Sequence, residues 1–243
     1  MEFARRGACL LLSGRDEERL ENVSARCLQV GAGMAATLPF DMGQGEGLEQ
    51  VAREGWRLLK GVDLLFCCAG VSQRGLALDT QMSVVRKVME VDFFGQVALI
   101  RGVAGLMVGQ GGGRIAVMSS IAGELGFPLR GGYSAAKHAL EGYVESLEAE
   151  CYANGIRTSI VVGGRINTPI SLRALEGDGR EHGVMDPGQA GGISAQRAAQ
   201  RIARGLLRGR RKINVGGVEM AILWIRRFFP ALSAAIVRRT SAV

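Results

Sequence analysis

Tyr133 and Lys137, a tyrosine and a lysine four residues apart, have the types and spacing that best fit acid–base chemistry in this chain. Residues i and i+4 of a helix lie on the same face, so the phenol and the ammonium would share one cleft. A nearby ammonium stabilises the phenolate, which makes the tyrosine a usable proton donor or acceptor near neutral pH. The spacing alone also arises by chance, so its context decides what it means.

Ser120 lies thirteen residues before Tyr133, directly after the apolar run at residues 114–118. Such a run predicts a buried strand, and doubly wound folds gather their active-site groups at the carboxyl ends of strands. A serine hydroxyl there could hold a carbonyl oxygen while the tyrosine supplies the proton. The alternative is a turn or capping serine, which is the common role of such residues.

Short apolar runs alternate with longer amphipathic stretches along the chain, which favours a parallel sheet covered by helices on both faces. The predicted fold class is α/β, a doubly wound, Rossmann-like sheet, with residues 1–217 as one domain. We predict a mobile loop at residues 171–192, which are rich in glycine and charge. Strands are predicted at residues 8–13, 34–39, 62–67, 114–118, 156–162 and 212–215, and helices at 17–30, 46–59, 82–108, 134–154 and 195–207.

With these elements in place, residues 1–215 resemble the short-chain dehydrogenase/reductase family, whose pattern is a serine followed by Tyr-x-x-x-Lys after such a strand. Four further stretches are similar to family motifs. They are Ser13-Gly14-Arg15 at the end of a strand, Phe40-Asp41-Met42 as the adenine-contacting turn, Cys67-Cys68-Ala69-Gly70 in place of Asn-Asn-Ala-Gly, and residues 164–168 as the stretch that closes over the nicotinamide.

The resemblance implies hydride transfer between a nicotinamide cofactor and an alcohol/ketone pair. In that mechanism Tyr133 protonates the oxygen, Ser120 positions it, and Lys137 stabilises the phenolate and holds the nicotinamide ribose. No metal is implied. The cofactor-binding residues implied by the resemblance are Arg15, Asp41, Met42, Ala69, Gly70, Tyr133, Lys137, Ile166 and Thr168.

The end of the first predicted strand favours NADP(H) over NAD(H). Enzymes that prefer NAD(H) place an acidic residue there to bind the ribose 2′-hydroxyl. Here Gly14 holds that position and Arg15 follows it. A guanidinium suits a 2′-phosphate. The alternative for Arg15 is a solvated side chain beside the start of a helix.

Asp92 departs from the family pattern, which has asparagine at this position. In the family the amide helps to hold the active-site helix and a water that leads to the lysine. A carboxylate could pair with Lys137, or it could oppose formation of the Tyr133 phenolate. We therefore include Asp92 among the candidate catalytic residues.

The first residues form a second departure, because the family opens with a strand and a glycine-rich turn that receives the pyrophosphate. Residues 1–8 resemble the end of the helix that follows this turn. We expect roughly 20 further residues before Met1. Without them, the first central strand would be missing between residues 8–13 and 62–67, leaving two unpaired edges. The chain as given would then bind NADP(H) weakly.

The net charge of +7 is concentrated after residue 196, where eleven arginines and lysines accompany one acid, Glu219. Residues 218–243 predict a basic amphipathic helix that is interrupted by arginine pairs and so cannot span a bilayer. It could lie in an anionic membrane interface, or pack over the substrate cleft or against a second subunit. Nucleic-acid binding is not expected, because no aromatic or groove-reading element accompanies the charge.

The five cysteines are odd in number and contain no CxxC pair, which argues against a disulfide framework or a zinc site and favours a reducing cytoplasm. We expect no signal peptide and no segment long enough to be a transmembrane helix. The predicted protein is an NADP(H)-dependent oxidoreductase of a small lipophilic alcohol or ketone. We expect a homo-oligomer, cytoplasmic or peripheral at the inner membrane face. The alternative is a catalytically silent member of the family that serves oligomerisation or membrane-surface binding.

Overall fold

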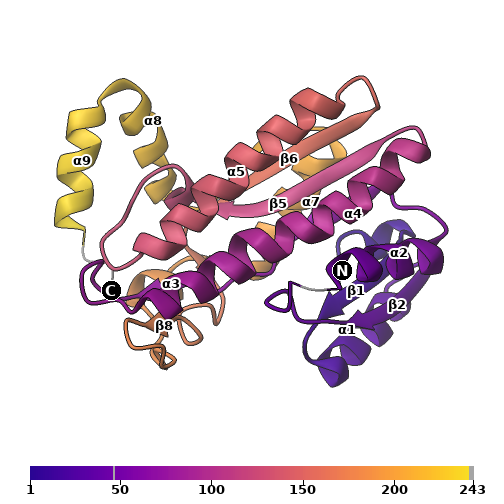
Figure 1. Ribbon diagram of the computed structural model, residues 1–243, viewed down its shortest axis with the longest axis horizontal. Helices are drawn as coiled ribbons and strands as arrows, with labels where there is room; N and C mark the ends of the chain where they lie inside the picture. The colour runs from indigo at the N-terminus through magenta and orange to yellow at the C-terminus, as the bar shows by residue number, and fades with distance from the viewer. Residues whose placement is uncertain (46, 241–243) are drawn as a thin grey trace.

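Parallel strands in two separate sheets form the framework of the protein (Figure 1). The computed structural model describes residues 1–45 and 47–240. The larger sheet has the order β10-β6-β5-β3 and the smaller one pairs β1 with β2, all in parallel. The α/β class is therefore confirmed. The strands are β1 (Cys9–Gly14), β2 (Met34–Pro39), β3 (Leu64–Cys67), β5 (Gly113–Ser120), β6 (Ile156–Gly163) and β10 (Lys212–Val215).

Helices cover both faces of the larger sheet, as the continuous apolar strands predicted. Alternate residues of β5 show the two faces: Ile115 and Val117 pack in the core under α4 and α5, whereas Ala116 packs in a second core beside α7. In Figure 1, α4 and α5 lie side by side in front of the sheet and α7 lies behind it. The main helices are α1 (Glu17–Gln29), α2 (Leu48–Leu59), α3 (Met82–Met89), α4 (Gly95–Gly109), α5 (Gly131–Cys151) and α7 (Ala195–Leu207).

Strands β1 and β3 each lie at an edge of their sheet. Within the described residues, β1 pairs only with β2, and β3 pairs only with β5. The expected pair of open edges is therefore present. Helix α2 joins the two parts, since it packs on both α4 and β1. Gly102 permits this close approach, because a Cβ there would lie 2.7 Å from the Cβ of Ala52.

One continuous helical segment, Met82–Gly109, contains α3, a π-helical turn at Glu90–Phe94, and α4. Single π turns inside α-helices are frequent at functional sites, and this one contains Asp92. By length and composition the segment is sufficient to cross a membrane, which corrects the expectation that no segment would be long enough. Its buried residues, including Ile100 and Met107, belong to the main core, as in the central helix of a globular domain.

Residues 171–192 have more structure than the predicted loop. They contain β8 (Leu175–Glu176), paired with β4 (Gln73–Arg74), and the short helix α6 (Pro187–Ala190). Asp186 is buried and forms an ion pair with Arg74, which is also buried. The pairing joins residues 112 positions apart in the sequence, so local composition could not reveal it.

The C-terminal segment forms two helices, α8 (Ala221–Phe228) and α9 (Pro230–Arg239), and not the single helix that was predicted. The break lies at Phe229, whose backbone is outside the helical region with φ −136° and ψ 66°. Proline disfavours a helical conformation in the residue before it and has no N–H for the preceding turn. The two helices form a hairpin (Figure 1). The predicted segment extends to residue 243, and its last three residues lie outside the described part of the chain.

Candidate active site

The carboxyl ends of the parallel strands meet along one edge of the fold, where the predicted site residues gather. Ser120 ends β5, and Ala69 and Gly70 follow β3 directly. Arg15 follows β1, and Asp41 and Met42 follow β2. The arrangement arises because every strand in the two sheets runs in parallel, which brings the loops after the strands to the same edge.

Lys137 and Asp92 form a buried ion pair at the centre of this edge. The Nζ of Lys137 lies 3.1 Å from the Oδ2 of Asp92 and donates a hydrogen bond of 3.0 Å to the Met118 carbonyl. The Oδ1 of Asp92 accepts a 2.7 Å hydrogen bond from the backbone N–H of Val71. The pair therefore connects α5, the π turn, the end of β5 and the loop after β3.

The charges of this pair depend on burial and on each other. Burial alone would lower the pKa of Lys137, but Asp92, followed by Tyr133, raises it above its ordinary value. Burial raises the pKa of Asp92, and Lys137 and the Val71 N–H act in the opposite direction. Oδ1 accepts the Val71 hydrogen bond and Oδ2 lies within ion-pair distance of the ammonium, an arrangement that favours an ionised carboxylate. The pairing of Asp92 with Lys137, one of the two roles considered for Asp92, is therefore present in the structure.

Tyr133 lies one helical turn before Lys137, whose Nζ is 5.7 Å from the centre of the phenol ring. The i, i+4 geometry predicted from the sequence is therefore present. Tyr133 is only 6% exposed and belongs to a small apolar cluster with Val88, Ala122 and Ala136. Residues of this cluster and its edge line two different cavities, whereas Tyr133 itself is in neither lining.

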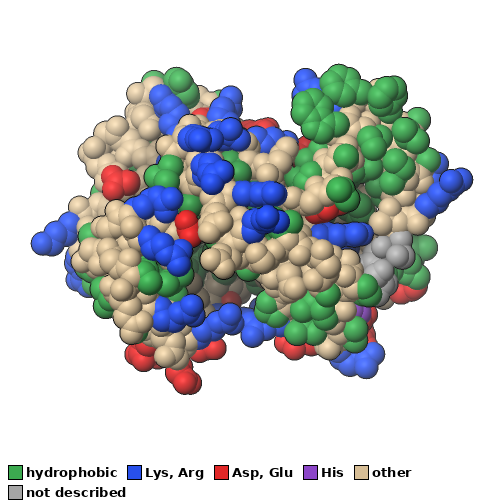
Figure 2. Space-filling view, turned by 180° about the vertical axis from the view of Figure 1, so that it is seen from behind, with side chains coloured by type: hydrophobic (Ala, Val, Ile, Leu, Met, Phe, Trp, Pro, Cys, Tyr) green, Lys and Arg blue, Asp and Glu red, His purple; other side chains and the backbone are tan. Residues whose placement is uncertain are grey.

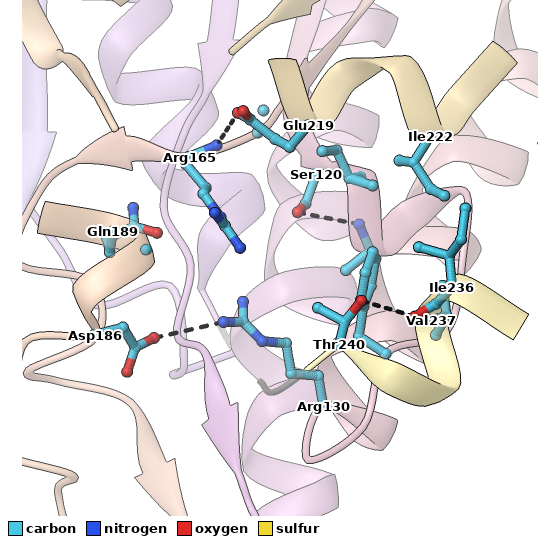
Figure 3. A pocket seen from close by; sticks show the side chains of 16 residues that line it. Ser120, Arg130, Arg165, Asp186, Gln189, Glu219, Ile222, Ile236, Val237 and Thr240 are labelled. Atoms are coloured by element: carbon cyan, nitrogen blue, oxygen red, sulfur yellow. Dashed lines mark hydrogen bonds and ion pairs between the residues drawn. The ribbon is translucent and has the colours of Figure 1, made fainter. Parts of the chain in front are cut away.

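The first of these, the Ser120 cavity, has a volume of about 470 Å³ (Figure 3). The Oγ of Ser120 accepts a 3.2 Å hydrogen bond from the Ala122 N–H, so it also fills the capping role considered for it. The hydroxyl proton remains available to a ligand. The cavity is lined by Ser120, Ile121, Ala122, Phe127, Arg130, Gly163, Gly164, Arg165, Asp186, Gly188, Gln189, Glu219, Ile222, Ile236, Val237 and Thr240.

The second, the Arg15 cavity, has a volume of about 580 Å³ and contains five of the predicted cofactor residues: Arg15, Asp41, Met42, Ala69 and Gly70. Lys87 and Arg173 also line it, and the sequence analysis missed both. Lys87 lies four residues before Val91 in the same helical segment, so both residues are on one face and line this cavity. Nothing in the sequence around Arg173 pointed to it.

Ile166 and Thr168 lie apart from both cavity linings. Ile166 is buried in β7 (Ile166–Asn167), which pairs with β9 (Ile193–Ser194). The hydroxyl of Thr168 is 3.4 Å from the Ile166 carbonyl, to which it donates. The structure therefore pairs Asp92 with Lys137 beside Tyr133, and places Ser120 in one cavity lining and Arg15 in the other. Tyr133, Lys137 and Asp92, like Ile166 and Thr168, are outside both linings.

Comparison with known proteins gives the family. The profile of the family described as short chain dehydrogenase matches residues 1–178. The chain belongs to the short-chain dehydrogenase/reductase family. A relative from Xenopus laevis, "Dehydrogenase/reductase SDR family member 7B", is 35% identical over an alignment 251 residues long. The alignment covers 99% of this chain and 78% of that protein. Because members of this family are oxidoreductases, the protein belongs to this enzyme class.

Solved structures of the family share the fold. A short-chain dehydrogenase/reductase from Burkholderia phymatum, in complex with NAD, has a TM-score of 0.80 at 22% identity, covering 95% of this chain and 88% of its own. A gluconate 5-dehydrogenase from Burkholderia cenocepacia, in complex with NADP and tartrate, has a TM-score of 0.64 at 24% identity, covering 69% and 66%. The Rossmann-like fold inferred from the apolar runs is thus confirmed.

Glu141 is a buried acid beside the site that the sequence analysis did not single out. It lies on the face of α5 toward β5 and accepts a short hydrogen bond from the Oγ of Ser119, the neighbour of Ser120. Burial raises the pKa of Glu141 to about 7, and the Ser119 hydrogen bond acts against that rise. The acid thus holds the Tyr133 helix onto the strand that ends in Ser120.

Glu141→Gln should flatten the pH dependence of stability. Between the ordinary pKa of 4.5 and about 7, the folded state binds the proton that the unfolded state has lost, so the free energy of unfolding falls as the pH rises. In the original protein, the free energy of unfolding should fall by on the order of 2 kcal/mol between pH 4.5 and 7.5, and Glu141→Gln should lack this fall. Urea denaturation across this range measures it.

Glu145→Gln is the matched control, since Glu145 is exposed one turn further along the same helix. It should retain most of the fall in stability. An equal fall in Glu141→Gln and in the original protein would show that Glu141 does not bind the proton.

Proposed function

We propose that the protein transfers a hydride between NADP(H) and a hydrophobic alcohol/ketone pair, with Tyr133 as the proton donor and acceptor. The observation that carries the proposal is the position of Tyr133. It lies beside the Lys137–Asp92 pair, in an apolar cluster whose members and edge residues line the Ser120 and Arg15 cavities. A proton donor among these residues can serve a substrate on one side and a cofactor on the other.

The residues of the Arg15 cavity fit a phosphate-bearing dinucleotide. Arg15, Lys87 and Arg173 supply three cations against the two acids Asp41 and Glu181. Gly70 brings the backbone close to the lysine, since a Cβ there would lie 3.4 Å from the Nζ of Lys137. NADP(H), when bound, supplies or accepts the hydride. Two solved proteins with this fold are in complex with NAD and with NADP, which supports a nicotinamide cofactor here. Arg15 favours NADP(H), the cofactor with the additional 2′-phosphate.

The side chains of the site bind the substrate oxygen and transfer the proton. Ser120 donates a hydrogen bond to the substrate oxygen, and Tyr133 gives the proton to it in reduction or takes it in oxidation. Lys137 stabilises the resulting phenolate. Its ammonium donates one hydrogen bond to the Met118 carbonyl and forms an ion pair with Asp92. Because an ammonium has three N–H groups, one can serve the cofactor ribose. Asp92 fixes the lysine in this orientation.

Tyr133→Phe should abolish turnover, a loss of at least about 100-fold, because the proton donor is removed. NADPH affinity should change little, since Lys137 makes the ribose contact. Steady-state kinetics with a lipophilic ketone and a fluorescence titration of NADPH measure the two effects. Tyr143→Phe, on the same helix and partly exposed, should keep its activity. Full turnover by Tyr133→Phe would contradict the assigned proton transfer.

Arg15→Ala should raise the Michaelis constant for NADPH at least about tenfold, because a charged hydrogen bond to the 2′-phosphate is lost. The constant for NADH should stay almost unchanged, as that cofactor has no 2′-phosphate. Arg19→Ala, in the next helix turn and also exposed, serves as the control. Equal effects on the two cofactors would show that Arg15 does not distinguish between them.

The C-terminal hairpin supports a second proposal, that the protein binds an anionic membrane surface from the cytoplasmic side. Trp224, Phe228, Phe229 and Leu232 are each more than half exposed on its outer face. Figure 2 shows hydrophobic side chains gathered over this region, with basic side chains at its edge. An exposed apolar patch of this kind marks an interaction surface, and flanking arginines suit anionic headgroups.

The double substitution Trp224→Ser/Phe228→Ser should reduce co-sedimentation with phosphatidylglycerol vesicles at least about tenfold. Thermal stability should change little, because both rings are 61–65% exposed. Leu78→Ser, at a residue that is 98% exposed elsewhere, should bind as the original protein does. Unchanged vesicle binding together with a smaller mass in size-exclusion chromatography would make the patch a subunit contact instead.

A further inference from the structure

Two guanidinium groups project into the Ser120 cavity, and neither has a role in the proposed reaction (Figure 3). Arg130 precedes α5 at its N-cap, three residues before Tyr133. Arg165 follows β6 and is solvent-exposed at the edge of the cavity. The two side chains come from different elements and point toward one another across the cavity.

The acids of this cavity do not neutralise both arginines. Asp186 is buried against Arg74, and the Nη2 of Arg130 lies at 3.5 Å from the same carboxyl oxygen. One carboxylate thus stands between two guanidinium groups. Glu219 accepts hydrogen bonds from the backbone N–H groups of Arg165, at 2.7 Å, and Gly217, at 2.9 Å. In residues 1–45 and 47–240, no carboxylate lies within ion-pair distance of the Arg165 guanidinium.

The surroundings of Arg130 also show an excess of positive charge. Burial lowers the pKa of Arg130, and the cations Arg74 and Arg165 lower it further, while Tyr133 and Asp186 act against them. An anion between Arg130 and Arg165 would relieve this repulsion.

Arg165 is held in place by the short helix α6. A Cβ at Gly188 would lie 3.0 Å from the Nε and 3.1 Å from the Cζ of Arg165. The guanidinium therefore packs directly on the backbone at Gly188. A planar guanidinium suits bidentate binding of a carboxylate or a phosphate.

Part of the remaining wall is apolar. Phe127 lines the cavity. Ile222, Ile236 and Val237 of the C-terminal hairpin lie together on one side of it. The volume of about 470 Å³ is within the range of sites that enclose small molecules. The cavity thus offers two cations, a hydrogen-bonding serine and a hydrocarbon surface to the same ligand.

We propose that the substrate is an amphiphile with an acid group, a carboxylate or a phosphate, which Arg130 and Arg165 bind while its apolar chain lies against α8 and α9. This proposal rests on the proposed function, because Ser120, which that function assigns to the substrate oxygen, lines this cavity. It narrows the substrate class from any lipophilic ketone to one that carries an oxyanion.

A binding experiment tests the acid-group site without any turnover. Isothermal titration calorimetry with decanoate, decyl phosphate and decanol compares ligands with the same chain. At least one of the two acids should bind at least about tenfold more tightly than the alcohol. Arg165→Gln should remove this preference, and Gly188→Ala should weaken it by displacing the guanidinium. Arg197→Gln, at an exposed position in α7, should retain it.

Arg165→Gln is the main variant because Arg165 has no ion pair to lose among the described residues, and thermal unfolding checks that the variant folds. Decanol binding as tightly as both acids, or an undiminished preference in folded Arg165→Gln, would overturn the inference.

A turnover experiment separates this inference from the proposed function. An oxo fatty acid and its methyl ester, each with NADPH, should differ in kcat/KM by at least about tenfold in favour of the acid. Equal turnover of the acid and the ester would overturn the acid-group site and leave the oxidoreductase function standing. Tight binding of the acids without turnover of any substrate would instead contradict the proposed function and support the site.

Discussion

The buried pair of Lys137 and Asp92 is the interaction on which the rest of the site depends. A lysine ammonium that is almost fully enclosed is stable only when an opposite charge and hydrogen-bond acceptors compensate for the lost water. Here the compensation comes from three separate parts of the chain: the π turn, the end of β5 and the loop after β3. The same contacts therefore fix the Tyr133 helix, the Ser120 strand and the Gly70 loop relative to one another.

This arrangement divides the edge of the fold into two chambers with different chemistry. The Arg15 cavity is formed by the loops after β1, β2 and β3, and the Ser120 cavity by those after β5 and β6 together with the hairpin. The small apolar cluster of Tyr133 has members or edge residues in both linings. Because the two chambers have different linings, they can hold different ligands while sharing one proton donor.

The sequence predicted the regular elements of the fold closely, because apolar runs in a parallel sheet are continuous and easy to delimit. Strands β2 and β10 and helix α7 have the predicted bounds. The pairing of Tyr133 with Lys137 was also predictable, since helical spacing alone brings them together. Long-range contacts were not: Arg74 meets Asp186, and Arg130 faces Arg165, only after folding. The break at Phe229 had a sequence signal in Pro230, which the search for a single amphipathic helix overlooked.

The C-terminal hairpin has two opposite faces with different surroundings. Ile222, Ile236 and Val237 face the Ser120 cavity, whereas Trp224, Phe228 and Phe229 face outward. When the outward face lies in a lipid monolayer, only the thickness of one helical hairpin separates the cavity from the acyl chains. An amphiphilic ligand then arrives by lateral diffusion in two dimensions, its supply set by its mole fraction in the membrane and not by its solubility in water.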